Sequence, residues 1–252
     1  MKSHELYAMY ILWLRQIKRY FRSRSRIIGS LGQPILFLVA LGFGLNSTFA
    51  ASGNGNYIQF LAPGIIAMSI LFSAVFSGIE IIWDRQFGFL KETLVAPVSR
   101  FSIMFGRTLG GATTSSLQGI LVLVISLLVG FRPHLAMIVP ALVFMVLISL
   151  VFTALGTAIA AKLEDMQGFQ LIMNFVIMPV FFLSGALFPL DTAPAALRWI
   201  AYFNPLTYGV DGLRAVLNGA SHFSAWMDLG ILVAISLAFV GIGAWLFSKI
   251  KA

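Results

Sequence analysis

EIIWDRQFGFLKETLVAPVSRFSIMFGR, residues 80–107, separates two long apolar runs and mixes both signs of charge with apolar side chains. Phe87, Leu90 and Leu94 recur in it at helical spacing, and the charged side chains fall largely on other faces. Pro97 would end such a helix, because proline does not continue one. The stretch therefore predicts a short amphipathic helix, residues 87–96, between two membrane spans. An ordinary solvated loop that happens to be helical would show the same spacing.

The composition around this stretch is that of an integral membrane protein. The 252 residues are 59% hydrophobic and 10% charged, whereas soluble domains are about half apolar and about a quarter charged. The apolar runs reach about 20 residues without alternation, which indicates helical spans and not barrel strands. The sequence contains no cysteine, so a disulfide framework is excluded.

Six apolar segments are predicted to cross the membrane within one domain, residues 1–252. They are residues 27–45, 57–83, 108–131, 135–161, 167–188 and 227–247. Pro34 in the first segment predicts a kink or a broken first turn, and Pro179 lies in the fifth segment. We therefore expect an all-α protein with a six-span bundle over residues 27–247.

The chain before the bundle, residues 1–26, predicts an amphipathic helix lying in the membrane interface. Leu6, Met9, Trp13, Ile17 and Tyr20 share one helical face. The basic residues of this segment are Lys2, Arg15, Lys18, Arg19, Arg22, Arg24 and Arg26. Such a basic side faces anionic headgroups. The charged region is too long for a signal peptide.

Residues 189–226 are too polar to span and too regularly apolar for a flexible loop. They predict two short re-entrant or interfacial helices that break at Asn204-Pro205. Tyr208 follows the break. Asp211 and Arg214 lie three residues apart, which predicts an ion pair on one helix face.

The basic residues are distributed unequally between the two sides of the membrane. With both termini in the cytoplasm, fourteen Lys and Arg residues lie inside and the other three, Arg132, Arg198 and Arg214, lie outside. This is the positive-inside distribution. The formal charge of +8 is therefore a topology signal, and nucleic acid is excluded as a partner.

The sequence contains no recognisable catalytic, nucleotide-binding or metal-binding motif. No GxxxxGK[ST] loop for nucleotide phosphates is present, and the three histidines are scattered, so neither a cofactor, a metal site nor a catalytic residue is expected. Glu80 lies about one turn from the cytoplasmic end of its span. It is either an interfacial carboxylate paired with Arg85 or Arg107, an ion relay, or a cytoplasmic gate. The protein is therefore not expected to be an enzyme, and a partner must supply its energy.

Two stretches resemble the type 2 ABC exporter permeases. The first is residues 80–107, and the second is FFLSGALFPLDTAPAALRWIAYFNPLTYGVDGLR, residues 181–214. The matching residues in the first are Glu80, Arg85, Gly88, Leu90, Glu92 and Pro97. Those in the second are Ser184, Gly185, Pro189, Pro194, Asn204, Pro205, Tyr208, Asp211 and Arg214. In length and loop pattern the chain is most similar to daunorubicin-resistance and nodulation-exporter permeases, which implies a place among multidrug-resistance transporters.

The resemblance implies a transmembrane subunit in the bacterial inner membrane, paired as a homodimer above two ATPase subunits that hold ATP and Mg²⁺. It makes residues 87–96 the coupling helix and the N-terminal helix a cytoplasmic gate or connecting helix. The implied ATPase contacts are Arg85, Phe87, Gly88, Leu90, Lys91, Glu92, Leu94 and Pro97. ATP binding would then drive the permease from inward-open toward outward-open.

The aromatic residues bear on the substrate. There are 23 Phe, six Tyr and five Trp, whereas a glycan path needs rings with polar tips. A lipophilic or amphipathic substrate, drug-like or lipid-like, is therefore favoured, with a polysaccharide or lipid-linked oligosaccharide as the alternative. A non-ABC secondary carrier or a membrane scaffold is the second alternative. A carrier would show mid-span carboxylates or inverted repeats, and the sequence shows neither.

Overall fold

The computed structural model of the protein describes residues 2–51, 53, 55–89, 93, 95, 97–163 and 165–249, and this part of the chain is helical without a strand. The α-helices are α1 Lys2–Arg22, α2 Arg24–Gly44, α3 Asn46–Ala51, α4 Tyr57–Phe76, α5 Ile79–Gln86, α7 Arg100–Val129, α8 Ile138–Lys162, α9 Met166–Ile172, α10 Met178–Phe182, α11 Ala195–Tyr202, α12 Pro205–Asn218 and α13 Ala225–Ser248. Single turns of 3-10 helix occupy Leu135–Met137 and Leu190–Thr192, and a π-helical turn occupies Met173–Ile177. The all-α prediction is confirmed.

Five helical segments within the described residues are long and apolar enough to cross a membrane. They are Arg24–Gly44, Tyr57–Gln86, Arg100–Val129, Leu135–Lys162 and Ala225–Phe247. Each overlaps one of the six predicted spans. The helix of the first continues through Pro34, which is buried inside it.

The remaining predicted span, residues 167–188, is shorter in the structure. It is the apolar helix Met166–Phe182, and the chain then turns at Gly185, whose φ is +74°. Its seventeen residues extend about 26 Å, less than the hydrocarbon core of about 30 Å. The π turn lies just before Pro179, and there the N–H of Met178 reaches back to Met173 O. A proline ring displaces the preceding helical turn, and a π turn accommodates that displacement.

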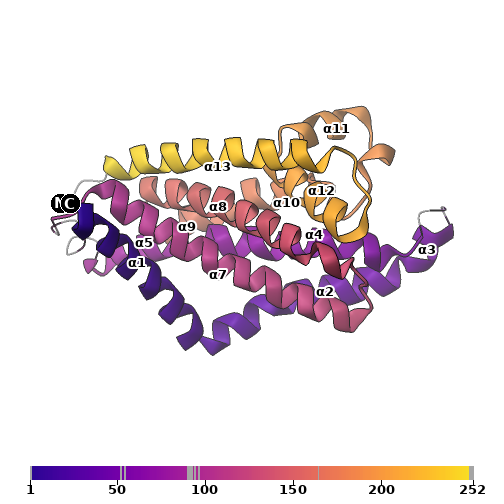
Figure 1. Cartoon of the computed structure of the whole chain (residues 1–252), viewed down its shortest axis with the longest axis horizontal. Coiled ribbons are helices and arrows are strands. Elements are labelled where there is room, and N and C mark those ends of the chain that lie inside the picture. The colour runs from indigo at the N-terminus through magenta and orange to yellow at the C-terminus, as the bar shows by residue number, and fades with distance from the viewer. Residues whose placement is uncertain are drawn as a thin grey trace.

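The long helices run along one axis of the molecule and pack around α4 (Figure 1). Helix α4 contacts α2, α7, α8 and α12 and supplies most of its surface to one apolar core, whereas α2 and α13 lie on the outside and are mostly exposed. The beginning of α1 and the end of α13 lie at the same end of the long axis, and α3 and α11 lie at the opposite end (Figure 1). The charged and the loop-rich regions are therefore separated by the length of the bundle.

Two glycines bring the second predicted span against α8. A Cβ on Gly78 would lie 2.4 Å from Gly156 O, and a Cβ on Gly156 would lie 2.6 Å from Val75 O. Neither position tolerates a side chain, because the neighbouring atoms belong to the backbone. At this contact the helix breaks into α4 and α5, and α5 positions Glu80 and Asp84.

The break between α11 and α12 falls at Asn204-Pro205, as predicted. Asn204 Oδ1 accepts a hydrogen bond of 3.0 Å from Leu206 N and so caps α12, and its Nδ2 donates to Val180 O at 2.6 Å. The hydroxyl of Tyr208 donates to Tyr202 O across the break at 2.6 Å. Side-chain hydrogen bonds from both flanks therefore hold this bend.

The predicted ion pair between Asp211 and Arg214 is wrong. Asp211 accepts hydrogen bonds from the backbone N–H groups of His222, at 2.8 and 3.0 Å, and Phe223, at 2.7 Å. Arg214 Nη2 donates to Phe60 O and Gly185 O, and burial lowers the pKa of Arg214 to about 10. Both side chains therefore bind backbone groups and not each other: Asp211 binds N–H groups of the loop before α13, and Arg214 binds one carbonyl of α4 and one of the turn at Gly185.

These backbone contacts determine the expected result of mutating Asp211 and Arg214. Asp211→Ala is expected to lower the free energy of unfolding by about 1–3 kcal/mol for each N–H group that loses its acceptor. The Asp211→Arg, Arg214→Asp exchange should restore nothing, because an arginine at 211 supplies no acceptor to residues 222 and 223. Thermal unfolding of the purified variants measures both effects. Recovery of wild-type stability in the exchange variant would reinstate the ion pair.

Candidate functional site

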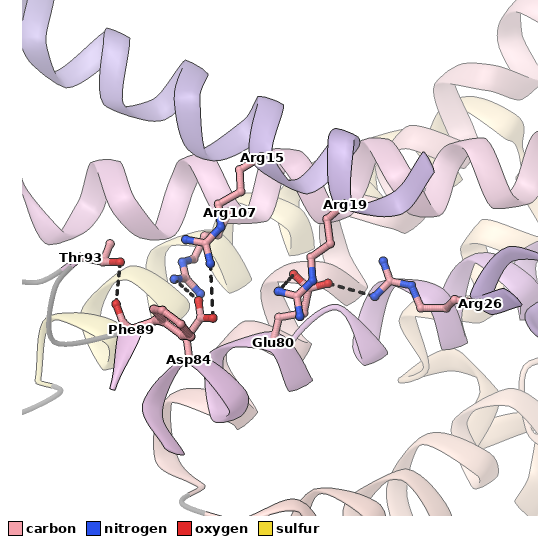
Figure 2. Close-up of polar contacts among 8 residues, drawn as sticks. All are labelled: Arg15, Arg19, Arg26, Glu80, Asp84, Phe89, Thr93 and Arg107. Atoms are coloured by element: carbon pink, nitrogen blue, oxygen red, sulfur yellow. Dashed lines mark hydrogen bonds and ion pairs between the residues drawn. The ribbon is translucent and has the colours of Figure 1, made fainter. Parts of the chain in front are cut away.

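Two buried carboxylates on α5, Glu80 and Asp84, face arginines from three other helices (Figure 2). Glu80 Oε1 accepts a hydrogen bond of 3.0 Å from Arg26 Nη1 on α2, and its Oε2 lies 3.6 Å from Arg19 Nη1 on α1. The guanidinium of Arg19 also lies 5.7 Å from the Trp83 ring centre. Glu80 therefore joins the end of α1 and the start of α2 to α5.

Asp84 lies one turn further along α5 and makes the second pair of contacts. Its Oδ2 accepts a hydrogen bond of 2.6 Å from Arg107 Nη2 on α7, and its Oδ1 lies 3.4 Å from Arg15 Nη2 on α1. Asp84 and Arg107 are both buried. We call these six residues, Arg15, Arg19, Arg26, Glu80, Asp84 and Arg107, the charged layer.

The predicted partners of Glu80, Arg85 and Arg107, are therefore wrong. Arg107 binds Asp84. Arg85 donates hydrogen bonds of 2.7 Å to Leu163 O and 3.0 Å to Ala161 O, so its guanidinium caps the end of α8. Arg85 thus fixes α5 to α8 and lies within α5, before the predicted coupling helix.

The predicted coupling helix also begins later than expected. Phe87 ends α5 through a hydrogen bond from its N–H to Trp83 O, and Gly88 takes φ +81°, which interrupts the helix. Phe89, Thr93 and Val95 are helical, and Thr93 Oγ1 donates to Phe89 O. Leu90, Lys91, Glu92 and Leu94 lie outside the described residues.

The described apolar residues of this segment are exposed. Phe87 is 73%, Phe89 53% and Val95 80% accessible. Exposed Pro97 follows them, and the chain then enters α7 at Arg100. We call residues 87–97 the coupling segment.

Glu5 ties the far end of the coupling segment to α1. Its carboxylate accepts hydrogen bonds from the backbone N–H and hydroxyl of Ser99, the N-cap of α7, and from the hydroxyl of Ser102 in the first turn of α7. The hydrogen bonds from Ser102, and then from Ser99, hold the pKa of Glu5 below its ordinary value. A negative charge at a helix N-terminus is favourable, so Glu5 joins α1 to α7.

Asp84 and Glu5 are functional candidates that the sequence analysis did not identify. For Asp84 a signal was present, because Glu80 and Asp84 are four residues apart, as are Arg15 and Arg19. Residues at this spacing lie on one helix face. The structure pairs 15 with 84 and 19 with 80, so the two helices run antiparallel where they meet.

A cavity of about 330 Å³ lies beside the charged layer, between α1, α2, α4, α5 and α7. Its lining combines rings and apolar side chains with hydroxyls and amides. The lining includes Tyr20, Arg26, Met68, Phe72, Glu80 and Gln118. This volume is within the range of about 300–1,000 Å³ typical of small-molecule sites.

Long apolar helices pack around one core, and two buried carboxylates and an exposed apolar segment lie at one end, so the fold is that of a polytopic membrane protein. Residues 7–218 match the sequence profile of the ABC-2 type transporter family. The chain belongs to this family, and it is a permease, the transmembrane subunit of an ABC transporter whose ATPase is a separate subunit.

Three relatives illustrate the match. Nodulation protein J of Rhizobium leguminosarum bv. viciae is 31% identical over 82% of this chain and 81% of its own length. The putative transport permease ycf38 of Cyanophora paradoxa is 30% identical over 90% of this chain and 80% of its own. The inner membrane transport permease YadH of Escherichia coli K12 is 27% identical over 92% and 91%. The resemblance stated from the two sequence stretches is thereby confirmed.

Proposed function

We propose that this permease carries a lipophilic or amphipathic molecule out of the cytoplasm, and that a second copy and two ATPase subunits complete the transporter. The cavity beside the charged layer is the observation that supports this substrate class. Met68, Phe72 and Phe76 offer it an apolar side, and Arg26, Glu80 and Gln118 offer polar groups. A molecule with one apolar and one polar part matches such a lining.

The coupling segment is the proposed contact to the ATPase. Phe87, Phe89 and Val95 are exposed, and the sequence of the segment also contains Lys91 and Glu92. Apolar anchors within a polar rim are the usual layout of a protein interface. Helix α5, which carries Glu80 and Asp84, ends at Gln86, directly before this segment. A displacement of the segment would therefore act on the charged layer, and through it on α1, α2 and α7.

The proposed orientation places both termini, the coupling segment and the charged layer in the cytoplasm, with six spans in the bacterial inner membrane. The unequal distribution of basic residues supports it. The beginning of α1 and the end of α13 lie at one end of the bundle, as an even number of spans requires (Figure 1). The short helix Met166–Phe182 serves as the fifth span. A helix shorter than the hydrocarbon core can cross the membrane upright, or where the bilayer is locally thinner.

Cysteine labelling tests this topology in intact cells. A cysteine in place of Ser221 is expected to react with an impermeant maleimide added from outside, and one in place of Ser99 is expected to react only after the cells are opened. Both serines are exposed, so burial does not confound the comparison. The reverse pattern would invert the proposed orientation.

A transport assay tests the substrate class. Proteoliposomes holding the permease with its ATPase are expected to move a fluorescent dodecyl derivative in an ATP-dependent manner, and to leave a fluorescent oligosaccharide behind. Ser73→Trp places an indole in the cavity, because Ser73 lines it, and should reduce transport at least tenfold. Leu237→Trp, at an exposed position on α13, should transport at the wild-type rate. Transport of the oligosaccharide alone would favour the glycan alternative and overturn the proposal.

A further inference from the structure

The cavity beside the charged layer is lined by one basic side chain, Arg26, and one acidic side chain, Glu80, among its described residues. Two arginines, Arg19 and Arg26, share that one carboxylate. Arg26 itself lines the cavity and uses Nη1 for Glu80. A guanidinium has five N–H donors, so most of the donors of Arg26 remain for a ligand.

A second donor lies deeper in the same cavity. Gln118 is buried, and its Oε1 accepts a hydrogen bond of 2.9 Å from the hydroxyl of Tyr20. Its Nε2 has no hydrogen-bond partner among the described residues. A buried donor without an acceptor is unfavourable, so an oxygen-rich ligand group at this end of the cavity would be stabilised by it.

The remaining lining provides an apolar site next to these donors. Met68 and Phe72 belong to α4, and Phe76 follows Phe72 one turn nearer the charged layer. Trp83 and Ile79 extend this apolar surface along α5. Apolar side chains and the cationic group thus occupy one continuous cavity.

We propose that the cavity takes an anionic amphiphile, whose acidic group, a carboxylate, phosphate or sulfate, binds Arg26 and whose apolar part lies along Met68, Phe72 and Phe76. This inference rests on the proposed function and adds the charge of the substrate to it. Charge-assisted hydrogen bonds to a guanidinium are stronger than neutral ones. A cationic amphiphile would leave Arg26 facing a like charge and would compete with Arg19 and Arg26 for Glu80.

Direct binding tests the sign of the charge. Full-length permease in phosphatidylcholine nanodiscs is titrated with 12-bromododecyl phosphate and, separately, with 12-bromododecyltrimethylammonium. Bromine quenches tryptophan emission, and Trp83 lines the cavity, so the signal lost in Trp83→Phe isolates binding at this site. The phosphate is expected to bind at least tenfold more tightly than the ammonium compound.

Matched variants separate the cavity from the general surface potential. Arg26→Gln is expected to weaken binding of the phosphate about tenfold, and Arg26→Lys is expected to retain most of it. Arg24→Gln removes the same charge from an exposed position two residues away that does not line the cavity, and binding should remain as in the wild type. Equal losses in Arg24→Gln and Arg26→Gln would overturn the inference.

Separate measurements test the source of the ligand and the proposed function. If the natural ligand is a lipid headgroup, phosphatidylglycerol in the nanodisc should compete with the bromododecyl phosphate and weaken its binding. If the natural ligand is a cytoplasmic anion, phosphatidylglycerol should leave the affinity for the bromododecyl phosphate unchanged. Tighter binding of the ammonium compound, with ATP-dependent transport of a neutral dodecyl probe intact, overturns the charge and leaves the proposed function standing. Absence of transport for every amphiphile overturns the proposed function, whatever binds in the nanodisc.

Discussion

Phe87→Asp combined with Leu90→Asp is expected to abolish co-purification of the ATPase and to reduce transport and permease-stimulated ATP hydrolysis together by at least tenfold. Phe87 is 73% accessible and bears no part of the apolar core. Burial of one such side chain in an interface is worth about 1.5–3 kcal/mol, so a charge in its place should weaken docking by about an order of magnitude or more. Insertion and yield of the permease should be unchanged.

A matched variant controls for the loss of an exposed aromatic ring. Phe203 is 83% accessible and follows α11 directly, and α11 lies at the opposite end of the bundle (Figure 1). Phe203→Asp should retain the ATPase and its stimulation. If the Phe87→Asp, Leu90→Asp variant instead keeps full stimulation at normal yield, the coupling segment is not the ATPase contact.

Asp84→Asn is expected to destabilise the permease by about 3–5 kcal/mol, because removing one partner leaves a buried charge unbalanced. Arg107 is buried, and its Nε and Nη1 already lack hydrogen-bond partners among the described residues, so Asp84 is its neutralising contact. Arg107→Gln should lower the free energy of unfolding by a smaller amount, because Asp84 retains its ion pair with Arg15 Nη2 at 3.4 Å. This asymmetry follows from two arginines sharing one carboxylate.

Thermal unfolding of the single and double variants in a common detergent measures this coupling. The Asp84→Asn, Arg107→Gln double variant should recover most of the stability lost in Asp84→Asn, because the two neutral amides leave no buried charge. Arg22→Gln, at an exposed position of α1, should change stability by about 0.5 kcal/mol or less. Additive losses in the double variant would show that the two side chains do not interact.

The charged layer connects four helices near the coupling segment. It joins α1, α2, α5 and α7 through four ion-pair contacts, and the coupling segment follows directly after α5. A change in the position of α5 would alter all four contacts at once. The effect of Asp84→Asn on transport should therefore exceed its effect on the amount of folded permease.

Much of the architecture followed from one-dimensional properties of the chain. Length and hydropathy of the apolar runs predicted the helical spans, because a helix in lipid must satisfy its own backbone and needs about 20 residues to cross. Proline and asparagine placed the break at Asn204-Pro205, since capping is a local interaction. The two stretches at residues 80–107 and 181–214 identified the family.

Tertiary structure alone decided which charges meet. The sequence placed Glu80 near Arg85 and Arg107, yet Arg85 binds the last carbonyls of α8, and Arg107 binds Asp84. Asp211 and Arg214 share a helix face without pairing, because each binds backbone groups of other parts of the chain. Spacing along a helix specifies the face on which a charge lies. The partner of that charge depends on which helix packs against the face. Here the packing is set by contacts between residues that are far apart in the sequence, such as Gly78 and Gly156.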